Sequence, residues 1–176
     1  MAVRPRRSVL YMPGSNARAI EKARTLAADA LILDLEDAVA PDAKFLARQQ
    51  VCDAVRAGGF GRREIFIRVN APDTPWGGED LAAAAAAMPD AILLPKVSTP
   101  EDLGAIGARL DALGAAAKIR IWAMMETPLA ILNAREIAAA AGEPATRLSG
   151  LVMGTTISPR TRGRRSFPAA RRCLLG

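Results

Sequence analysis

Short apolar segments alternate with amphipathic, alanine-rich segments along most of this 176-residue chain. In LILDL, AILLPK and IWAMM nearly every position is hydrophobic, rather than every second one. This pattern is typical of strands that are buried on both faces, as in a parallel sheet covered by helices. It predicts six strands, at Ser8–Met12, Ala30–Asp34, Glu64–Val69, Ala91–Lys96, Ile119–Glu126 and Gly150–Gly154.

The segments between these strands have helical patterns. Thr99 followed by Pro100 and two acids combines an N-cap residue, a proline at the first helical position and acids in the first turn. Strands and helices that alternate through short connections indicate a right-handed β/α architecture. The predicted helices are Asn16–Ala27, Asp42–Ala57, Gly78–Ala87, Thr99–Leu113 and Pro128–Ala141.

Such a sheet is either open and doubly wound or closed into a (β/α)8 TIM barrel. The loop after the first strand reads MPGSN instead of G-x-G-x-x-G, which weakens the case for a dinucleotide-binding fold. Polar residues follow most strands, as in a barrel, whereas an open sheet gathers its site at one switch point. We therefore predict an α/β barrel. It is incomplete, with about six β/α units, because a whole barrel takes about 250 residues.

Composition excludes several classes of protein. The chain has no histidine, which rules out Ser-His-Asp and Cys-His nucleophile systems and histidine-ligated metals. Two cysteines are too few for a disulfide framework, so we expect a cytoplasmic protein. No apolar run approaches the roughly 18 residues that cross a bilayer. Pro13-Gly14 comes too early for a signal peptide, so no membrane partner is expected.

The net charge of +6 resides in one segment. Residues 155–176 contain six arginines and no acid, so the remainder of the chain has as many acidic as basic residues. An arginine-rich segment with one aromatic residue and no recognisable module makes nucleic acid the weakest of the candidate partners.

Three carboxylates end the second predicted strand, in Asp34-Leu35-Glu36-Asp37. Clustered acids suit a hard cation such as Mg²⁺, or a carboxyl group kept protonated by its neighbours. Solvated loop acids together with a helix cap are an equally good interpretation.

Other polar residues follow the remaining strands. Arg68 offers a rigid fork for a carboxylate or an enolate oxygen, or an internal salt bridge to the nearby acids. Glu126 follows an apolar strand and is costly to bury unless a metal meets it; its alternative is a cap for the helix at Pro128. Lys96 is a Schiff-base candidate but more often a charge partner. Ser15 and Asn16 form a turn whose N–H groups suit a phosphate or a substrate edge, although such turns are common.

The segments RSVLYMPGSN, LILDLEDAVAPDAK, IFIRVNAPDTPWGGEDL, AILLPKV, METPLAILNAREIA and GLVMGT together carry a family resemblance. In order and spacing, across about residues 4–155, they closely resemble the citrate lyase β-subunit-like branch of the HpcH/HpaI aldolase and citrate lyase family. The resemblance implies a (β/α)8 barrel that makes or breaks a carbon–carbon bond in a hydroxyacyl-CoA of the citryl-, malyl- or citramalyl-CoA kind, using Mg²⁺. It also implies homo-oligomers for intact members.

The resemblance further implies a role for individual residues. Arg68 would bind the substrate carboxylate and the developing enolate, and Glu126 would ligate Mg²⁺. Glu36 and Asp37 would support the metal and its waters. The loop that holds Ser15 and Asn16 would lie beside the active site. A mechanism of this kind needs no protein nucleophile, because the metal and the guanidinium neutralise the oxygens where charge grows.

The sequence departs from the family pattern after Thr155. The family reads Gly-Thr-Asn-Asp-Leu-Ala, in which the Asp is the second metal ligand, whereas this chain has Ile157 at that position. Deleting one nucleotide from a plausible coding, ACC AAC GAT CTC GCC, yields Thr-Thr-Ile-Ser-Pro, which is the sequence observed. We therefore predict a barrel domain over residues 1–155 and an out-of-frame, disordered arginine-rich tail over residues 156–176.

Two functional classes remain open at this stage. The first is a Mg²⁺-dependent CoA-ester lyase, with little or no activity expected of the 176-residue chain itself. The second is a non-catalytic fragment, or an interaction subunit that completes its barrel with another chain.

Overall fold

A computed structural model describes residues 5–154 of the chain, so the predicted tail and Ile157 lie outside the described residues. Within this part, six parallel strands form one sheet in the order β1-β2-β3-β4-β5-β6. Neighbours in the sheet are thus neighbours along the chain, as in a barrel that is built up one β/α unit at a time. The strands are β1 (Val9–Pro13), β2 (Ala30–Asp34), β3 (Glu64–Arg68), β4 (Ala91–Leu94), β5 (Arg120–Met125) and β6 (Leu148–Met153).

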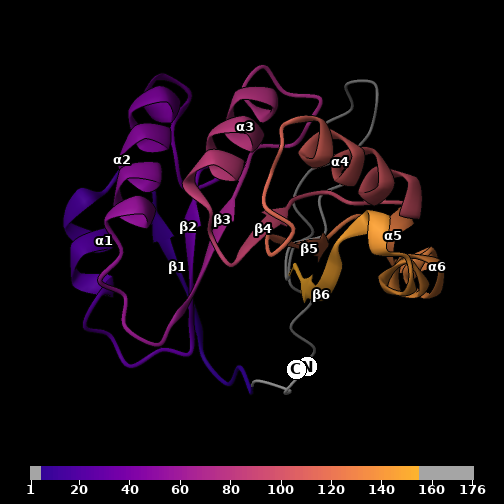
Figure 1. The fold of residues 1–176 in the computed structure, drawn as a ribbon, viewed down its shortest axis with the longest axis horizontal. Coiled ribbons are helices and arrows are strands. Elements are labelled where there is room, and N and C mark those ends of the chain that lie inside the picture. The colour runs from indigo at the N-terminus through magenta and orange to yellow at the C-terminus, as the bar shows by residue number, and fades with distance from the viewer. Residues whose placement is uncertain (1–4, 155–176) are drawn as a thin grey trace, which may run out of the picture.

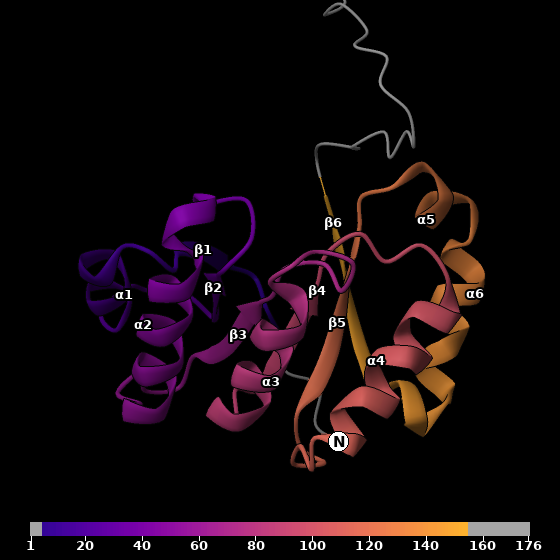
Figure 2. The same ribbon diagram turned by 90° about the horizontal axis from the view of Figure 1, so that it is seen from above.

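The helices follow one another in an arc along one face of the sheet (Figure 1). Figure 2, turned by 90°, shows α2, α3 and α4 in succession on the same side. The helices are α1 (Ala17–Ala23), α2 (Lys44–Ala57), α3 (Gly77–Ala87), α4 (Pro100–Ala112), α5 (Pro128–Leu132) and α6 (Ala134–Ala139). Short 3₁₀ turns cover Pro41–Ala43, Ala140–Gly142 and Pro144–Thr146. None of the helices in residues 5–154 is long and apolar enough to span a membrane.

Both faces of the central strands are buried, as their continuous apolar sequences predict. In β2, Leu31 and Leu33 belong to the large core between the sheet and the helices. Ala30 and Ile32 pack on the opposite face with Phe66 and other inward-pointing side chains. The two outermost strands differ, because each has one neighbouring strand in the described part of the chain. Tyr11 in β1 is 40% exposed and Met153 in β6 is 64% exposed.

Some boundaries differ from the predicted ones. The single helix predicted over Pro128–Ala141 is interrupted at Asn133, which separates α5 from α6. The Asn133 side chain donates a 2.9 Å hydrogen bond to the carbonyl oxygen of Ser98, and this tertiary contact has no counterpart in the helical sequence pattern. The apolar pattern predicts a fourth strand that reaches Lys96, but the strand ends at Leu94. Pro95, which has no N–H group for a strand ladder, follows directly.

Candidate active site

The predicted site residues on β2 and β3 come together because of strand register. Asp34 and Arg68 are register partners at the carboxyl ends of these two strands. Arg68 donates from Nε to Asp34 Oδ1 at 2.7 Å and from Nη2 to Oδ2 at 2.6 Å. Both side chains are buried, at 8% and 1% exposure. Asp34 therefore holds the guanidinium through two parallel hydrogen bonds, the geometry for which arginine is suited.

This pairing gives Asp34, the first carboxylate of the acidic cluster, an internal role. Asp34 also accepts hydrogen bonds from the backbone N–H groups of Glu36, at 2.8 Å, and Ala38, at 3.1 Å. With both carboxylate oxygens engaged, Asp34 clamps the arginine and the following loop and is not available to a cation. Asp37 is 70% exposed and lies 3.6 Å from Arg68 Nη1, at the edge of the site.

The internal partners of Arg68 fix the position of its guanidinium without using all of its N–H groups. A guanidinium carries five N–H groups. Asp34 takes two of them, Nη1 donates to Met124 Sδ at 3.6 Å, and Nη1 also lies 3.0 Å from Glu36 Oε2. The guanidinium lies 5.1 Å from the centre of the Tyr11 ring. Burial lowers the pKa of Arg68, but the hydrogen bonds and charge of Asp34 outweigh it and raise the pKa. A charged guanidinium that keeps N–H groups without a hydrogen bond in the described part of the chain is thus held at the carboxyl ends of the strands. We call this region, which holds Glu36, Arg68, Lys96 and Glu126, the mouth of the sheet.

Glu36 bridges Arg68 to Lys96. It is buried, and its Oε1 accepts a 2.5 Å hydrogen bond from Lys96 Nζ. Its Oε2 makes no hydrogen bond within residues 5–154. Burial raises the pKa of Glu36, with Lys96 and Arg68 opposing the shift. Burial lowers the pKa of Lys96, but the hydrogen bond and charge of Glu36 outweigh it and raise the pKa. The geometry places Lys96 as a charge partner, which favours the second of its two predicted roles.

Glu126 lies on the other side of the same mouth, directly after β5. Its side chain is buried, and its Oε1 accepts a 2.8 Å hydrogen bond from the backbone N–H of Lys96. Its Oε2 has no hydrogen bond or ion pair with residues 5–154. Glu126 does not cap the next helix. Thr127 does so, because its hydroxyl accepts from Ala130 N at 3.0 Å.

Gly154 makes room for the Glu126 side chain. A Cβ at position 154 would lie 2.5 Å from Glu126 Cβ, closer than real Cβ contacts come, and 3.2 Å from Oε2. The Gly154 backbone N–H donates to the carbonyl oxygen of Met125 at 3.1 Å, which fixes this approach. Because Gly154, directly after β6, has no side chain, it leaves a space beside the Glu126 carboxylate that any larger residue would fill. We call this space the Gly154 cradle.

Ser15 and Asn16 are exposed in the loop after β1. Asn16 Oδ1 accepts a 3.0 Å hydrogen bond from Ala19 N and so caps α1. Neither side chain hydrogen-bonds to another predicted site residue in the described part of the chain. Their contact with a substrate stays a prediction, as do the metal and substrate roles of the other site residues.

Sequence analysis missed a buried network behind the site. Lys44 Nζ donates to the carbonyl oxygens of Leu35 and Glu36 and to Asn70 Oδ1, at 2.7, 2.6 and 2.8 Å. Burial lowers the pKa of this lysine. Asp80 is wholly buried and accepts from Asn70 N and Nδ2 at 3.0 and 2.6 Å. The network therefore ties the loop after β2 to the end of β3.

The helical periodicity could have revealed these charged residues. The buried positions of α2 are Lys44, Ala47, Arg48, Val51 and Cys52, and those of α3 include Gly77, Asp80, Leu81 and Ala84. Both sets follow the i, i+3, i+4, i+7 spacing of a helix face that packs on a core. Arg48 Nε donates to Asp80 Oδ1 at 2.7 Å across the two helices. A charge within an apolar helix face signals a partner on a neighbouring element.

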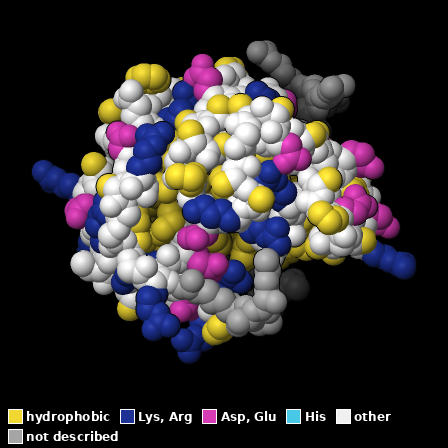
Figure 3. Space-filling model, in the orientation of Figure 1, with side chains coloured by type: hydrophobic (Ala, Val, Ile, Leu, Met, Phe, Trp, Pro, Cys, Tyr) yellow, Lys and Arg dark blue, Asp and Glu magenta, His cyan; other side chains and the backbone are white. Residues whose placement is uncertain are grey.

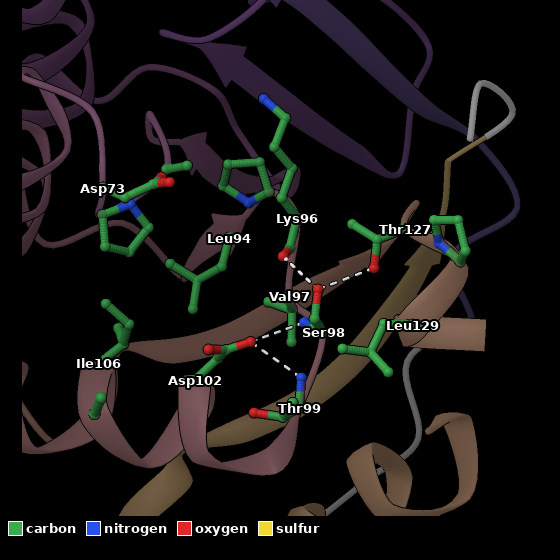
Figure 4. A pocket seen from close by; sticks show the side chains of 15 residues that line it. Asp73, Leu94, Lys96, Val97, Ser98, Thr99, Asp102, Ile106, Thr127 and Leu129 are labelled. Carbon is green, nitrogen blue, oxygen red and sulfur yellow. Dashed lines mark hydrogen bonds between the residues drawn. The ribbon is translucent and has the colours of Figure 1, made fainter. Parts of the chain in front are cut away.

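A cavity of about 650 Å³ adjoins the mouth on the side of β4 and β5, and Lys96 and Thr127 stand on its wall (Figure 4). Acidic and basic side chains lie next to one another in the middle of the face shown in Figure 3.

Within residues 5–154 no group of three or more Cys, Asp or Glu side chains is placed to hold a metal ion. For a cation, this part of the chain offers chiefly the Glu126 carboxylate.

Six parallel strands that alternate with helices, with charged residues gathered at their carboxyl ends, define an α/β protein of the TIM-barrel-like aldolase type. The family model HpcH/HpaI aldolase/citrate lyase matches residues 7–156, and the chain belongs to that family.

Named relatives within the family differ in their chemistry. The chain is 51% identical over 164 residues to a (3S)-malyl-CoA thioesterase of Cereibacter sphaeroides strain KD131, covering 93% of this chain and 54% of the relative. It is 36% identical to citrate lyase subunit beta of Escherichia coli K12, with 86% and 50% covered. The chain spans about half the length of the curated relatives it matches.

A solved structure supports the same assignment. The Mycobacterium tuberculosis protein CitE, in complex with magnesium, acetoacetate and coenzyme A, superposes with a TM-score of 0.65 at 28% identity. The match covers 86% of this chain and 49% of that chain. The predicted family and fold class are therefore confirmed, while the lyase activity is not decided, because a relative with 51% identity is named a thioesterase.

Proposed function

We propose that this chain forms the arginine-bearing half of an active site for the CoA thioester of a malate-like hydroxy acid. The observation that carries the proposal is the buried Arg68–Asp34 pair, which presents a fixed guanidinium at the carboxyl ends of the strands. Preorganised donors of this kind stabilise charge that develops on a substrate oxygen and cost no reorganisation during the reaction.

Hydrolysis of the thioester is the first candidate reaction. It is favoured by the 51% identity to the malyl-CoA thioesterase, against 36% to citrate lyase subunit beta. In hydrolysis, water attacks the thioester carbonyl carbon and the CoA thiolate leaves. Arg68 would stabilise the oxyanion of the tetrahedral intermediate.

Cleavage of the carbon–carbon bond, as predicted from the sequence, is the second candidate and is favoured by the citrate lyase relative. Here the hydroxyl proton is removed, the bond between the two carbons breaks, and an acetyl-CoA enolate and a 2-oxo acid form. Arg68 would then face the enolate oxygen. Both reactions place negative charge on a former carbonyl oxygen, so one guanidinium serves either.

The described residues fit one position of a Mg²⁺ site. Glu126 Oε2 has no partner there, and the missing side chain of Gly154 leaves space beside it. Four carboxylates (Asp34, Glu36, Asp37 and Glu126) lie with three cationic side chains (Arg68, Lys96 and Lys44), so negative charge is in excess by one. Mg²⁺ takes oxygen ligands, one or two of them carboxylates, and would polarise the substrate carbonyl. Because position 157 is Ile, we propose weak Mg²⁺ binding and little turnover by this chain.

A non-catalytic role as one part of a split barrel is a different class of function. The observation that favours it is that β1 and β6 each have a single neighbouring strand within residues 5–154, where Leu10 is 37% and Leu151 41% exposed. An unprotected strand edge is a template for pairing with another chain. A subunit of this kind would leave malyl-CoA intact by itself.

The test incubates the full chain with (3S)-malyl-CoA and Mg²⁺ and identifies the products. Free CoA thiol with malate indicates hydrolysis, whereas glyoxylate with acetyl-CoA indicates carbon–carbon cleavage. Any turnover should vanish in Arg68→Met. Because weak turnover is expected, binding is measured in parallel as the rise in melting temperature with malyl-CoA. The proposal is wrong if malyl-CoA raises the melting temperature of the natural chain and of Arg68→Met equally. It is also wrong if malyl-CoA raises the melting temperature of neither chain.

A further inference from the structure

Lys96 has an unusual backbone for its position in the fold. Its φ of 56° lies in the left-handed region, which it shares with Met88 and Arg147 among the non-glycine residues from 5 to 154. Met88 ends α3, and Arg147 ends the 3₁₀ turn Pro144–Thr146, where left-handed residues are common. Lys96 ends no helix. It follows β4 by two residues, and a lysine there requires a structural reason.

The left-handed turn points two parts of one residue at two different acids. The backbone N–H of Lys96 donates to Glu126 Oε1 at 2.8 Å. The ammonium of the same residue donates to Glu36 Oε1 at 2.5 Å. Glu126 follows β5 and Glu36 follows β2, so one residue of the β4 loop spans the mouth between them.

The turn at Lys96 is held in place by the hydroxyl groups of Ser98 and Thr127 and by the carboxylate of Asp102, as Figure 4 shows. Ser98 Oγ donates to the carbonyl oxygen of Lys96 at 3.2 Å and lies 2.9 Å from Thr127 Oγ1. Thr127 is the neighbour of Glu126 along the chain. The backbone N–H groups of Ser98 and Thr99 both donate to Asp102 Oδ2, at 2.8 and 3.0 Å. The unfavourable φ of Lys96 is thus maintained by the hydrogen bonds of Lys96 itself and by those of Ser98 and Thr99, which follow it.

We propose that Lys96 is a positioning residue for the Glu126 carboxylate, and that it acts through its left-handed backbone N–H rather than through its charge. By engaging Oε1, this N–H directs Oε2 of Glu126 toward the mouth, where a divalent cation would bind. The inference rests on the proposed function for the identity of that cation.

Two uncharged variants separate the backbone from the ammonium group. Lys96→Asn and Lys96→Val both lose the ion pair with Glu36. Asparagine tolerates the left-handed region, whereas a β-branched valine is strongly disfavoured there. The affinity for Mn²⁺, used as a spectroscopic probe in place of Mg²⁺, is measured on the full chain by electron paramagnetic resonance. We expect Lys96→Asn to bind Mn²⁺ within about threefold of the natural chain and Lys96→Val at least about tenfold more weakly.

The outcomes are distinguishable. Equal weakening in the two variants would overturn the proposal, because the ammonium would then be the important group. The second measurement is hydrogen exchange at the Lys96 amide in metal-free buffer. We expect protection in the natural chain and its loss in Glu126→Ala, while the Phe66 amide on β3 stays protected. An unprotected Lys96 amide in the natural chain overturns the proposal. If the natural chain binds no Mn²⁺, the metal part of the proposed function fails, and the exchange result alone decides the role of Lys96.

Discussion

The two sides of the candidate site are built to different degrees of completeness. On the arginine side, Arg68 is held by Asp34, and the loop after β2 is held by Lys44, Asn70 and Asp80. All of these side chains are buried, and they come from two central strands and the two helices that cover them. Every carboxylate or amide in this group has at least two partners.

On the glutamate side, the contacts are few. Glu126 accepts one hydrogen bond, from Lys96 N, and packs against Gly154 at the end of an outermost strand. Arg68 ends β3 and Glu126 follows β5, and both strands have two neighbours, but the neighbours of β3 are central strands whereas one neighbour of β5 is the outermost strand β6. A residue beside the last strand depends on whatever pairs with that strand.

The largest expected effect comes from breaking the network behind Arg68. Asp80→Ala leaves Arg48 Nε and the backbone N–H of Asn70 without their buried acceptor, and it should lower the free energy of unfolding by about 3–5 kcal/mol, measured with urea. Glu79 is the matched control, because it pairs with the same Arg48 but is 74% exposed. Glu79→Ala should cost less than about 1 kcal/mol. Similar losses in the two variants would mean that the network does not depend on burial.

The clamp on the guanidinium ranks second. Asp34→Asn keeps the shape of the side chain but turns an amide N–H toward Arg68 Nη2, so about 2–3 kcal/mol of stability should be lost. Asp37→Asn is the control at the exposed edge of the same site and should change stability by less than about 0.5 kcal/mol. Urea unfolding measures both. An Asp34→Asn chain as stable as the natural one would contradict the clamp.

On the glutamate side the effect should appear in cation binding. Gly154→Ala pushes a methyl group against Glu126 and should weaken Mn²⁺ or Mg²⁺ binding about tenfold, or 1.4 kcal/mol. Gly104→Ala is the control, because a Cβ at that position inside α4 would have no neighbour within 4 Å among the described residues. It should leave cation binding unchanged and stabilise the helix by about 0.5–1 kcal/mol. Unchanged cation binding in Gly154→Ala would contradict the proposal that the space at Gly154 lets the Glu126 carboxylate bind a cation.

The smallest effect concerns pH. Because the pKa of Glu36 is raised above 4.5 in the folded chain, the folded state holds a proton that the unfolded state has released. The contribution of Glu36 to the free energy of unfolding should therefore fall as pH rises from about 4.5 through the raised pKa, by less than about 1.4 kcal/mol per pH unit. Glu36→Gln should remove this part of the slope in urea unfolding between about pH 4 and 7. Parallel curves for the two chains would contradict the raised pKa.

Much of the fold follows from local patterns. The apolar runs of β2 to β5 predict buried parallel strands, because only burial on both faces accounts for them. Strand order then follows from chain order, since short β/α connections place successive strands side by side. The same logic predicts that Glu36, Arg68 and Glu126 meet at one mouth, because each follows the end of a parallel strand.

The sequence by itself therefore determined the family, the six-strand architecture and the residues that share the mouth. Only the tertiary structure decided that Asp34 clamps Arg68, that Asn133 interrupts a helix, and that Lys96 turns into the left-handed region. The physical reason is distance along the chain. Periodicity and capping act over a few residues, whereas the partners of Arg68, Asn133 and Lys96 lie 34, 35 and 30 residues away and are chosen by strand register and packing.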